Sequence, residues 1–172
     1  MAGDLQIHNI DPVYDEESRV LLLGSFPSVR SREAGFFYAH PRNRFWPLLA
    51  RLFSLPEAQT VEEKKALLHA QHIALWDSAA SCTITGSGDA SIRNAQPNDI
   101  PALLAKTKIC AIFANGQTAY ALYRRLIEPK TGISARLLPS TSPANAAFSM
   151  ERLLEEWACV RDTLLNEENN LL

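Results

Sequence analysis

The sequence predicts an α/β fold, a three-layer sandwich in which a central, mostly parallel sheet of four strands lies between helices. Short apolar runs that end in glycine or a polar residue alternate along the chain with segments of helical periodicity, and this alternation is typical of such sheets. The 172 residues are 47 % hydrophobic and 21 % charged, an ordinary globular composition. That length suits one domain over residues 1–172, with loosely ordered ends expected at 1–17 and 166–172.

Composition also excludes several classes of protein. No apolar run approaches the roughly 18 residues of a membrane span, and Met1–Ile10 lacks the shape of a signal peptide, so we expect a cytoplasmic protein without a membrane partner. Cys82, Cys110 and Cys159 are an odd number without a CxxC pair, which argues against disulfides and a zinc site. We expect a monomer without metal or cofactor. The net charge of −2 means that any nucleic-acid partner must be bound at a local site.

The first half of the chain contains two predicted strands and two predicted helices. Residues 19–24 are apolar up to a glycine, which suits a buried strand, whereas residues 25–42 lack a helical period and are predicted to be a long loop. Loops of that length are usually functional. A helical pattern then resumes, with Asn43 as its expected N-cap and Pro47 in its first turn. The elements predicted after the loop are a helix at 45–53, a helix at 61–71 and a strand at 73–76.

The second half repeats this alternation. Residues 77–97 are long and polar and are predicted to be a loop, after which Asn98 is the expected cap of a short helix. Asn115 and Gly116 end the clearest buried strand. The elements predicted here are a helix at 100–105, a strand at 109–114, a helix through Tyr120 to Leu126, a strand at 135–138, a loop at 139–145 and a helix at 150–165.

Three polar segments follow predicted strands, at residues 24–43, 77–97 and 139–145. The carboxyl ends of parallel strands meet at one edge of a sheet, and ligands of open α/β sheets bind in the crevice at that edge. We therefore expect the functional site where these three segments converge.

The first motif is the pentapeptide of Gly24, Ser25, Phe26, Pro27 and Ser28. Glycine lets the backbone turn sharply out of the strand, and proline stiffens the next step. On such a rigid loop, the flat ring of Phe26 could stack on a ligand. The alternative is an ordinary turn with Phe26 packed into the core.

The second motif, Tyr38–Trp46, brings an imidazole, two guanidiniums, an amide and three aromatic rings into nine residues. Arginines and amides bind phosphates and base edges, and aromatic rings stack on bases. The alternative is an exposed loop followed by a helix cap, with Trp46 in the core.

The third motif, Pro139–Asn145, has two prolines that hold three hydroxyls and their backbone N–H groups in a fixed loop. Such a loop can grip a phosphate without net positive charge. The alternative is an ordinary turn rich in proline and serine.

Taken in order, the three motifs resemble the uracil-DNA glycosylase superfamily. Gly24–Ser28 is similar to its first motif, a Gly-x-x-Pro loop after the first strand, and Pro139–Pro143 is similar to its second, a Pro-Ser loop that enters the DNA minor groove. Ala39–Trp46 is similar to the His-Pro-x-Asn-Arg-Phe-Trp run of the mismatch-specific glycosylases. The pairing of Gly-Ser-Phe-Pro with His-Pro-Arg-Asn most resembles the hypoxanthine (deoxyinosine) glycosylase branch.

The resemblance implies a monofunctional repair enzyme that flips a deaminated base out of damaged DNA and hydrolyses its N-glycosidic bond without a cofactor. Hypoxanthine is the implied base, with uracil and xanthine as lesser candidates. The better-known branches place Asp or Asn inside the first motif to position water, whereas Ser25 and Phe26 stand there in this chain. The resemblance offers Asn43 as the catalytic amide that orients the water.

The resemblance also implies roles for the other motif residues. Gly24–Ser28 would bind the base, with backbone N–H groups on the leaving base and Phe26 stacked on it. His40 as a general acid and Asp77 as a water-activating carboxylate are lesser catalytic candidates, whose alternatives are a loop hydrogen bond and a strand-end cap. Ser142–Asn145 would fill the vacated groove. The expected DNA-binding residues are Arg42, Arg44, Ser140, Ser142, Pro143, Ala144 and Asn145.

Two other functions stay open at this point. One is a nucleoside- or nucleotide-binding α/β module that holds a free ligand in the same loops, although the chain has no GxGxxG or GxxxxGK[ST] cradle. The other is a catalytically lapsed family member that only binds DNA. A glycosylase is expected to gather five arginines on the loop edge, namely Arg30, Arg32, Arg42, Arg44 and Arg93.

Overall fold

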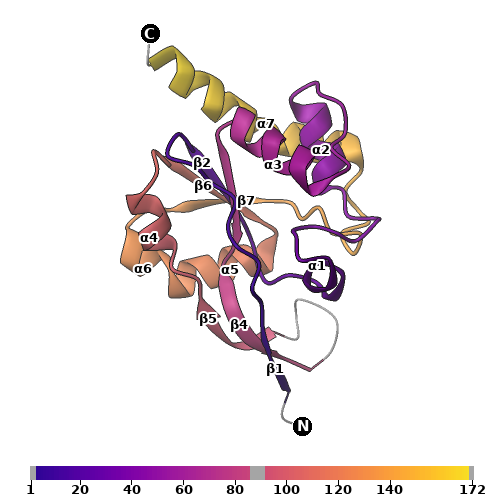
Figure 1. Ribbon diagram of the computed structural model, residues 1–172, viewed down its shortest axis with the longest axis vertical. Helices are drawn as coiled ribbons and strands as arrows, with labels where there is room; N and C mark the ends of the chain where they lie inside the picture. Colours follow the sequence, from indigo (N-terminus) through magenta and orange to yellow (C-terminus); the bar gives the residue numbers. More distant parts are fainter. Residues whose placement is uncertain (1–2, 86–91, 171–172) are drawn as a thin grey trace.

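The structure is a computed structural model that describes residues 3–85 and 92–170. Its centre is a four-stranded sheet in the order β3-β2-β6-β7, in which all neighbouring strands run parallel (Figure 1). The predicted parallel α/β sandwich is therefore confirmed. The four strands are β2 (Val20–Gly24), β3 (Ile73–Asp77), β6 (Ala111–Asn115) and β7 (Ala135–Leu138).

Alternation of side chains along β2 divides the core between the two faces of the sheet. Val20 and Leu22 pack with the apolar side chains of α2 (Phe45–Leu52), α3 (Val61–Ala70) and α7 (Met150–Asn170). Leu21 and Leu23 pack on the other face. Figure 1 shows the two groups of helices on opposite sides of the sheet. The helices of the second group are α4 (Ile100–Ala105), α5 (Gln117–Leu126) and α6 (Glu128–Thr131).

A short helix lies inside the segment 25–42 that was expected to be a loop. This helix, α1 (Val29–Ala34), begins where the Ser28 side chain accepts a hydrogen bond from the backbone N–H of Ser31, and it ends at Gly35, whose φ of 70° is left-handed. Ser31 is its one buried residue. The helix has no apolar stripe, so hydrophobic periodicity did not predict it, and the capping residues were its signal.

The segment 77–97 was also wrongly predicted to be a loop. It contributes β4 (Ala79–Ile84) and β5 (Ile92–Pro97), which pair antiparallel with each other and form a second sheet with β1 (Asp4–Ile7). β4 begins with two alanines and β5 carries the polar run Arg93-Asn94, so period-2 hydrophobic alternation is weak. Pairing of the two strands with each other and of β4 with β1 stabilises them instead. Residues 86–91 of this predicted loop lie outside the described residues.

Within the described residues, regular structure extends into both regions that were expected to be loosely ordered, 1–17 and 166–172. β1 pairs with β4, and Val13 forms a bridge with Leu75 of the central sheet. α7 continues to Asn170, five residues beyond its predicted end. A stripe of buried side chains anchors α7 to the core. No helix among residues 3–85 and 92–170 is long and apolar enough to cross a membrane. The buried residues of that stripe are Leu153, Trp157, Val160 and Leu164.

The strand order creates one point where connections leave in opposite directions. β2 lies between β3 and β6, and the chain runs from β2 to β3 on one side and then crosses to β6 on the other. A crevice at the carboxyl ends of such strands is where open α/β sheets bind ligands. The fold thus places the crevice next to Gly24 and Asn115, the last residues of β2 and β6.

Candidate active site

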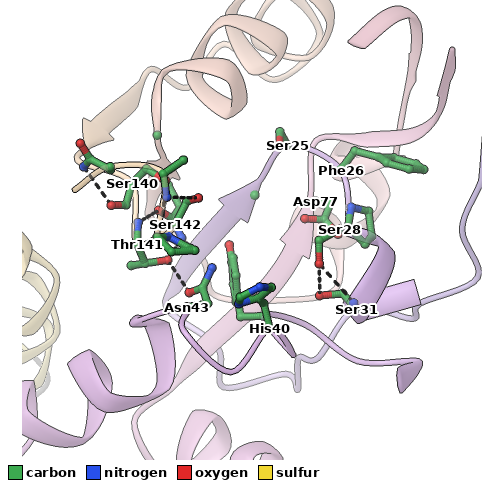
Figure 2. A pocket seen from close by; sticks show the side chains of 18 of the residues that line it. Ser25, Phe26, Ser28, Ser31, His40, Asn43, Asp77, Ser140, Thr141 and Ser142 are labelled. Atoms are coloured by element: carbon green, nitrogen blue, oxygen red, sulfur yellow. Dashed lines mark hydrogen bonds between the residues drawn. The ribbon is translucent and has the colours of Figure 1, made fainter. Parts of the chain in front are cut away.

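A pocket of about 850 Å³ lies at this crevice, and all three predicted segments line it. Gly24 to Ser28, Asp77 and Ser140 to Asn145 form much of its wall, so the prediction that these segments converge is confirmed (Figure 2). The β6–α5 junction, Asn115–Gln117, completes this side of the wall. Within residues 3–85 and 92–170, no group of three or more His, Cys, Asp and Glu side chains could hold a metal ion.

Gly24 allows two oxygen-bearing side chains to lie against the end of β2. A Cβ at this position would lie 2.4 Å from Oδ1 of Asp77 and 2.9 Å from the hydroxyl of Tyr38, so only glycine permits the approach. Asp77 is paired with Gly24 in the β2–β3 register and is only 4 % exposed. The site therefore contains a carboxylate at the edge of the sheet, supplied by the neighbouring strand rather than by the first motif itself.

The ring of Phe26 lines the pocket but is packed as a core side chain. It is 7 % exposed, with the guanidinium of Arg32 5.4 Å from its centroid and the imidazole of His8 edge-on at 5.2 Å. In Figure 2 the ring points away from Asn43 and Thr141. This packing does not support a role in stacking on a base and favours the alternative in which Phe26 belongs to the core. Its other buried neighbours are Ala79, Cys82, Ala95 and Leu122.

His40 lines the pocket with its ring held by the following residues. Its Nδ1 atom accepts the backbone N–H of Arg42 at 3.1 Å, so the neutral ring carries its proton on Nε2. The loop hydrogen bond that was the structural alternative for His40 is therefore present. The ring is also half-exposed beside the pocket, where its Nε2–H group is a hydrogen-bond donor.

Asn43 has its carbonyl oxygen fixed and its amide nitrogen available. Oδ1 accepts the backbone N–H of Phe45 at 3.0 Å and the hydroxyl of Thr141 at 2.9 Å. Nδ2 has no hydrogen-bond partner among the described residues, and the side chain lines the pocket. Asn43 is not the N-cap of α2, which is Arg44, but it still satisfies the first N–H group of that helix. The amide can therefore offer the pocket only donors.

Thr141 is the buried centre of the third motif. The residue is fully buried, its N–H donates to Oδ1 of Asn115 at 3.0 Å, and its carbonyl accepts the N–H of Arg44 at 3.0 Å. Its hydroxyl lies 3.0 Å from Nδ2 of Asn115 and 2.9 Å from Oδ1 of Asn43. Thr141 thus joins the ends of β6 and β7 to the segment before α2 (Figure 2).

The rest of the third motif is held by hydrogen bonds within itself. The N–H of Ser142 donates to Oγ of Ser140 at 3.1 Å, and the N–H of Ala144 donates to Oγ of Ser142 at 3.2 Å. The N–H of Asn145 donates to the carbonyl of Ser142 at 3.0 Å. These N–H groups are occupied, so they do not provide the predicted grip on a phosphate. The hydroxyl hydrogens of the two serines remain as donors that the loop can present.

Arg44 makes several hydrogen bonds within the protein. Its guanidinium donates to the carbonyls of Ser142 at 3.3 Å, Asn145 at 3.0 Å and Phe148. Three of its donors are thus engaged by this loop, which does not favour the predicted direct contact of Arg44 with DNA. Arg42 is exposed and keeps its predicted role as a proposal. Of the other three arginines expected at this edge, Arg32 lines the pocket and donates to Gln6 at 2.6 Å, whereas Arg30 and Arg93 are exposed.

Sequence reasoning missed several residues of the pocket. Asn115 was read only as a strand end, and Thr141 only as one hydroxyl of a turn, because their contacts join positions 26 and 98 residues apart in sequence. The available signal was an amide at the carboxyl end of a parallel strand. Phe148 and Glu156, which no motif included, also line the pocket.

Comparison with known proteins supports the same interpretation. The family model described as the uracil DNA glycosylase superfamily matches residues 12–163. Two curated relatives are named hypoxanthine DNA glycosylase. The one from Methanosarcina acetivorans is 34 % identical over 86 % of this chain and 93 % of its own length, and the one from Methanosarcina barkeri is 29 % identical over 86 % and 92 %. The solution NMR structure of a candidate uracil DNA glycosylase from Methanosarcina acetivorans superposes with a TM-score of 0.79 at 31 % identity, covering 94 % of this chain and 99 % of that one.

Proposed function

The chain belongs to the uracil DNA glycosylase superfamily, and we propose that it removes hypoxanthine, the base of deoxyinosine, from damaged DNA. It is a DNA glycosylase by family, and two curated relatives that it covers almost completely carry the name of the hypoxanthine enzyme. Uracil and xanthine are proposed as lesser substrates. The proposed enzyme acts as a monomer on chromosomal DNA, in the nucleoid of the cytoplasm.

One observation carries this proposal: a pocket large enough for a flipped base has a fixed amide and a buried carboxylate in its wall. The volume of about 850 Å³ lies within the usual range of small-ligand pockets, roughly 300–1,000 Å³. Asn43 offers N–H donors to the pocket, and Asp77 offers a carboxylate at the end of β3. Hydrogen-bond donors suit a departing base, and a carboxylate suits a sugar that develops positive charge.

The proposed reaction begins when the damaged base leaves the stack, at a cost of about a few kcal/mol that is smallest for mispaired bases. The bond between C1′ and N9 then breaks, and its electron pair stays on the purine. Donors from Asn43 and Nε2–H of His40 stabilise the charge on that leaving base. A water molecule forms the new bond to C1′, and its proton passes to the carboxylate of Asp77.

Contacts to the DNA backbone are proposed for the exposed side of the same edge. Arg42 would contact a phosphate, and the hydroxyls of Ser140 and Ser142 would donate to phosphate or sugar oxygens. The tip of the third motif, residues 143–145, would enter the space left by the flipped base. Its internal hydrogen bonds fix the loop before DNA arrives, so less conformational entropy is lost on binding.

The test uses duplexes that carry one inosine, uracil or xanthine, followed by alkaline cleavage of abasic sites. We expect strand cleavage at inosine, and the single-turnover rate should fall at least roughly tenfold in Asn43→Ser, which is ~1.4 kcal/mol of barrier. Asn166→Ser, an exposed position on α7, is the matched control and should keep the parental rate. Tight binding without cleavage of any of the three bases would indicate a lapsed member that only binds DNA.

A further inference from the structure

We propose that Thr141 and Asn115 are positioning residues that fix the amide of Asn43 with its N–H donors toward the pocket. This inference rests on the proposed function and extends it to base selection. An amide fixed in this direction pairs with a hydrogen-bond acceptor on the flipped base, such as the 6-oxo group of hypoxanthine. It disfavours adenine, which has an amino group at the same position.

The direction of the Asn43 amide follows from a backbone donor. The N–H of Phe45 can only donate, and it lies 3.0 Å from the side chain of Asn43. The atom that it meets must therefore be the carbonyl oxygen Oδ1. Nδ2 then lies on the other branch of the amide, and both of its hydrogens are available to the pocket.

A second backbone donor fixes the direction of the next two hydrogen bonds. The N–H of Thr141 can only donate, so the atom of Asn115 that lies 3.0 Å away is Oδ1. Nδ2 of Asn115 consequently donates to the Thr141 hydroxyl at 3.0 Å. The hydroxyl hydrogen is then left for Oδ1 of Asn43 at 2.9 Å. We call the chain of hydrogen bonds from Asn115 through the Thr141 hydroxyl to Asn43 the relay. The backbone N–H groups of Phe45 and Thr141 set the direction of each of its bonds.

Burial makes the relay resistant to rotation of the amide. Thr141 is fully buried, and Asn43 and Asn115 are half-buried. If the Asn43 amide turned over, its NH₂ group would face the N–H of Phe45, a donor that cannot turn away, and the Thr141 hydroxyl would have to turn its hydrogen away from Asn43. The bond from Phe45 would be lost in a poorly solvated place, where unpaired polar groups are costly. The amide is therefore a fixed donor rather than a group that adapts to whichever base arrives.

A fixed donor has a specific consequence for a purine glycosylase. Hypoxanthine and adenine differ at one position, where the first has a carbonyl oxygen and the second an amino group. An amide that could rotate would accept a hydrogen bond from adenine as readily as it donates one to hypoxanthine. A site that cannot rotate leaves polar groups unpaired with the wrong base, which is the strongest form of discrimination without editing. The same donor stabilises charge on hypoxanthine as it departs.

The first experiment removes the relay hydroxyl and asks whether it acts through Asn43. Thr141→Val should lower the single-turnover rate on an inosine duplex at least roughly tenfold, and Thr141→Ser, which keeps the hydroxyl, should recover most of the rate. In an Asn43→Ala background, Thr141→Val should cause no further loss, because the group that it positions is gone. The relay would be contradicted if Thr141→Val kept the parental rate. It would also be contradicted if Thr141→Val lowered the rate by the same factor in the wild-type and the Asn43→Ala proteins.

A second experiment does not depend on how well Thr141→Val folds. Asn43→Asp keeps oxygen acceptors for Phe45 and Thr141, but it replaces the donors facing the pocket with an acceptor. It should lower inosine excision at least roughly 100-fold, whereas an amide that merely accepts a hydrogen bond from water would be replaced well by aspartate. The wild-type enzyme should also excise the base of deoxynebularine, which lacks the 6-oxygen, at least roughly tenfold more slowly than hypoxanthine.

The outcomes separate the relay from the proposed function. A wild-type enzyme that cleaves no inosine duplex would contradict the proposed function. An active wild-type enzyme whose Asn43→Asp variant retains the parental rate would contradict the relay alone. Equal rates on deoxynebularine and inosine would contradict the selection of a 6-oxo base.

Discussion

The first and third motifs line the same pocket but are held in place by different forces. In the first motif, residues 24–28, the anchor is the ring of Phe26, which packs into an apolar cluster between β4, β5 and α5. In the third, residues 139–145, the anchor is a set of hydrogen bonds that involve Thr141, Asn115 and the Arg44 guanidinium. The first loop is therefore anchored by an apolar side chain, beside backbone hydrogen bonds from Ser78 to Gly24 and from Ala79 to Ser25, whereas the side-chain anchors of the third are polar.

This difference separates stability from chemistry. Packing is not directional, so the first motif can fix a backbone path but says little about which way a polar atom points. Hydrogen bonds are directional, and those of the third motif determine which atom of Asn43 faces the pocket. We expect substitutions in the first motif to unfold the protein more, and substitutions in the third to disturb the site more.

The largest expected effect is on stability, from Phe26→Ala. Truncating a buried phenylalanine removes its transfer free energy and leaves a cavity, so the free energy of unfolding should fall by about 3 kcal/mol. Urea denaturation followed by tryptophan fluorescence measures it. Val29→Ala is the control, because Val29 is an exposed residue at the start of α1. It should change the free energy of unfolding by less than about 0.5 kcal/mol. A loss in Phe26→Ala as small as in the control would show that packing does not hold the first motif.

The next effect comes from Gly24→Ala. The added methyl group would meet Asp77 and the hydroxyl of Tyr38, so one of them must move, at a cost of about 2 kcal/mol in unfolding free energy. Because the displaced carboxylate is the proposed proton acceptor, inosine excision should fall at least roughly tenfold as well. Gly132→Ala is the control: its φ of 69° also strains alanine, but its Cβ meets nothing within 4 Å. Equal excision rates in the two variants would contradict the close approach at Gly24.

Arg44→Ala tests the third motif and should have a smaller effect on stability. The variant loses the donors to Ser142, Asn145 and Phe148, which we expect to cost about 1.5 kcal/mol because the guanidinium is half-exposed. The activation free energy of excision should nevertheless rise by more than the free energy of unfolding falls. The reason is that this loop carries Thr141, which positions the amide of Asn43. The salt dependence of DNA binding should stay unchanged.

Arg42→Ala is the matched control for that comparison. Its side chain is exposed, so stability should stay within about 0.5 kcal/mol, whereas the slope of log affinity against log salt should become shallower by about 0.9. If Arg44→Ala changed the slope and Arg42→Ala did not, the assignment of the two arginines would be reversed.

The same contrast explains how much of the fold was predictable from the sequence. The four strands of the central sheet carry continuous apolar runs, and the helices that cover them carry apolar stripes, so local patterns predicted both. β4 and β5 carry no continuous apolar run, and β4 also pairs with β1, which is about 80 residues away in the sequence. Apolar patterning therefore did not predict these two strands.

For the site, the sequence predicted many of the pocket residues but not the directions of their contacts. Asn43, His40 and Asp77 do line one pocket. The occupied guanidinium of Arg44 and the donor-only face of Asn43 both depend on partners about 100 residues away. Local chemistry offered a phosphate contact and a catalytic amide. Tertiary hydrogen bonds engage the guanidinium of Arg44 with backbone carbonyls and leave the N–H donors of Asn43 for the pocket.

The smallest expected effect is a pH dependence that belongs to the first motif. His8 packs edge-on against Phe26, donates from Nε2 to the carbonyl of Ala79 at 3.0 Å, and accepts the N–H of Ile10 at Nδ1. Burial is the main cause that lowers the pKa of His8 below 6.5, and the positive charge of Arg32 lowers it further, against the opposing effect of the Ala79 carbonyl. The neutral ring is thus the form that the folded protein prefers.

The sign of this effect follows from proton binding. Between the lowered pKa of the folded state and 6.5, the unfolded chain binds more protons, so stability rises with pH in that window. The contribution is fully present above about pH 6.5 and is lost as the pH falls through the folded-state pKa. His8→Gln, which can still donate to Ala79 but does not titrate in this range, should flatten the dependence of unfolding free energy on pH between about 7.5 and 5.5. Phe26→Ala should flatten it too, because it exposes the imidazole, whereas Arg44→Ala in the third motif should leave the slope as it is. If the slope of unfolding free energy against pH were the same in all three variants and the wild type, His8 would not be the origin of the pH dependence. The two motifs would then not differ in this respect.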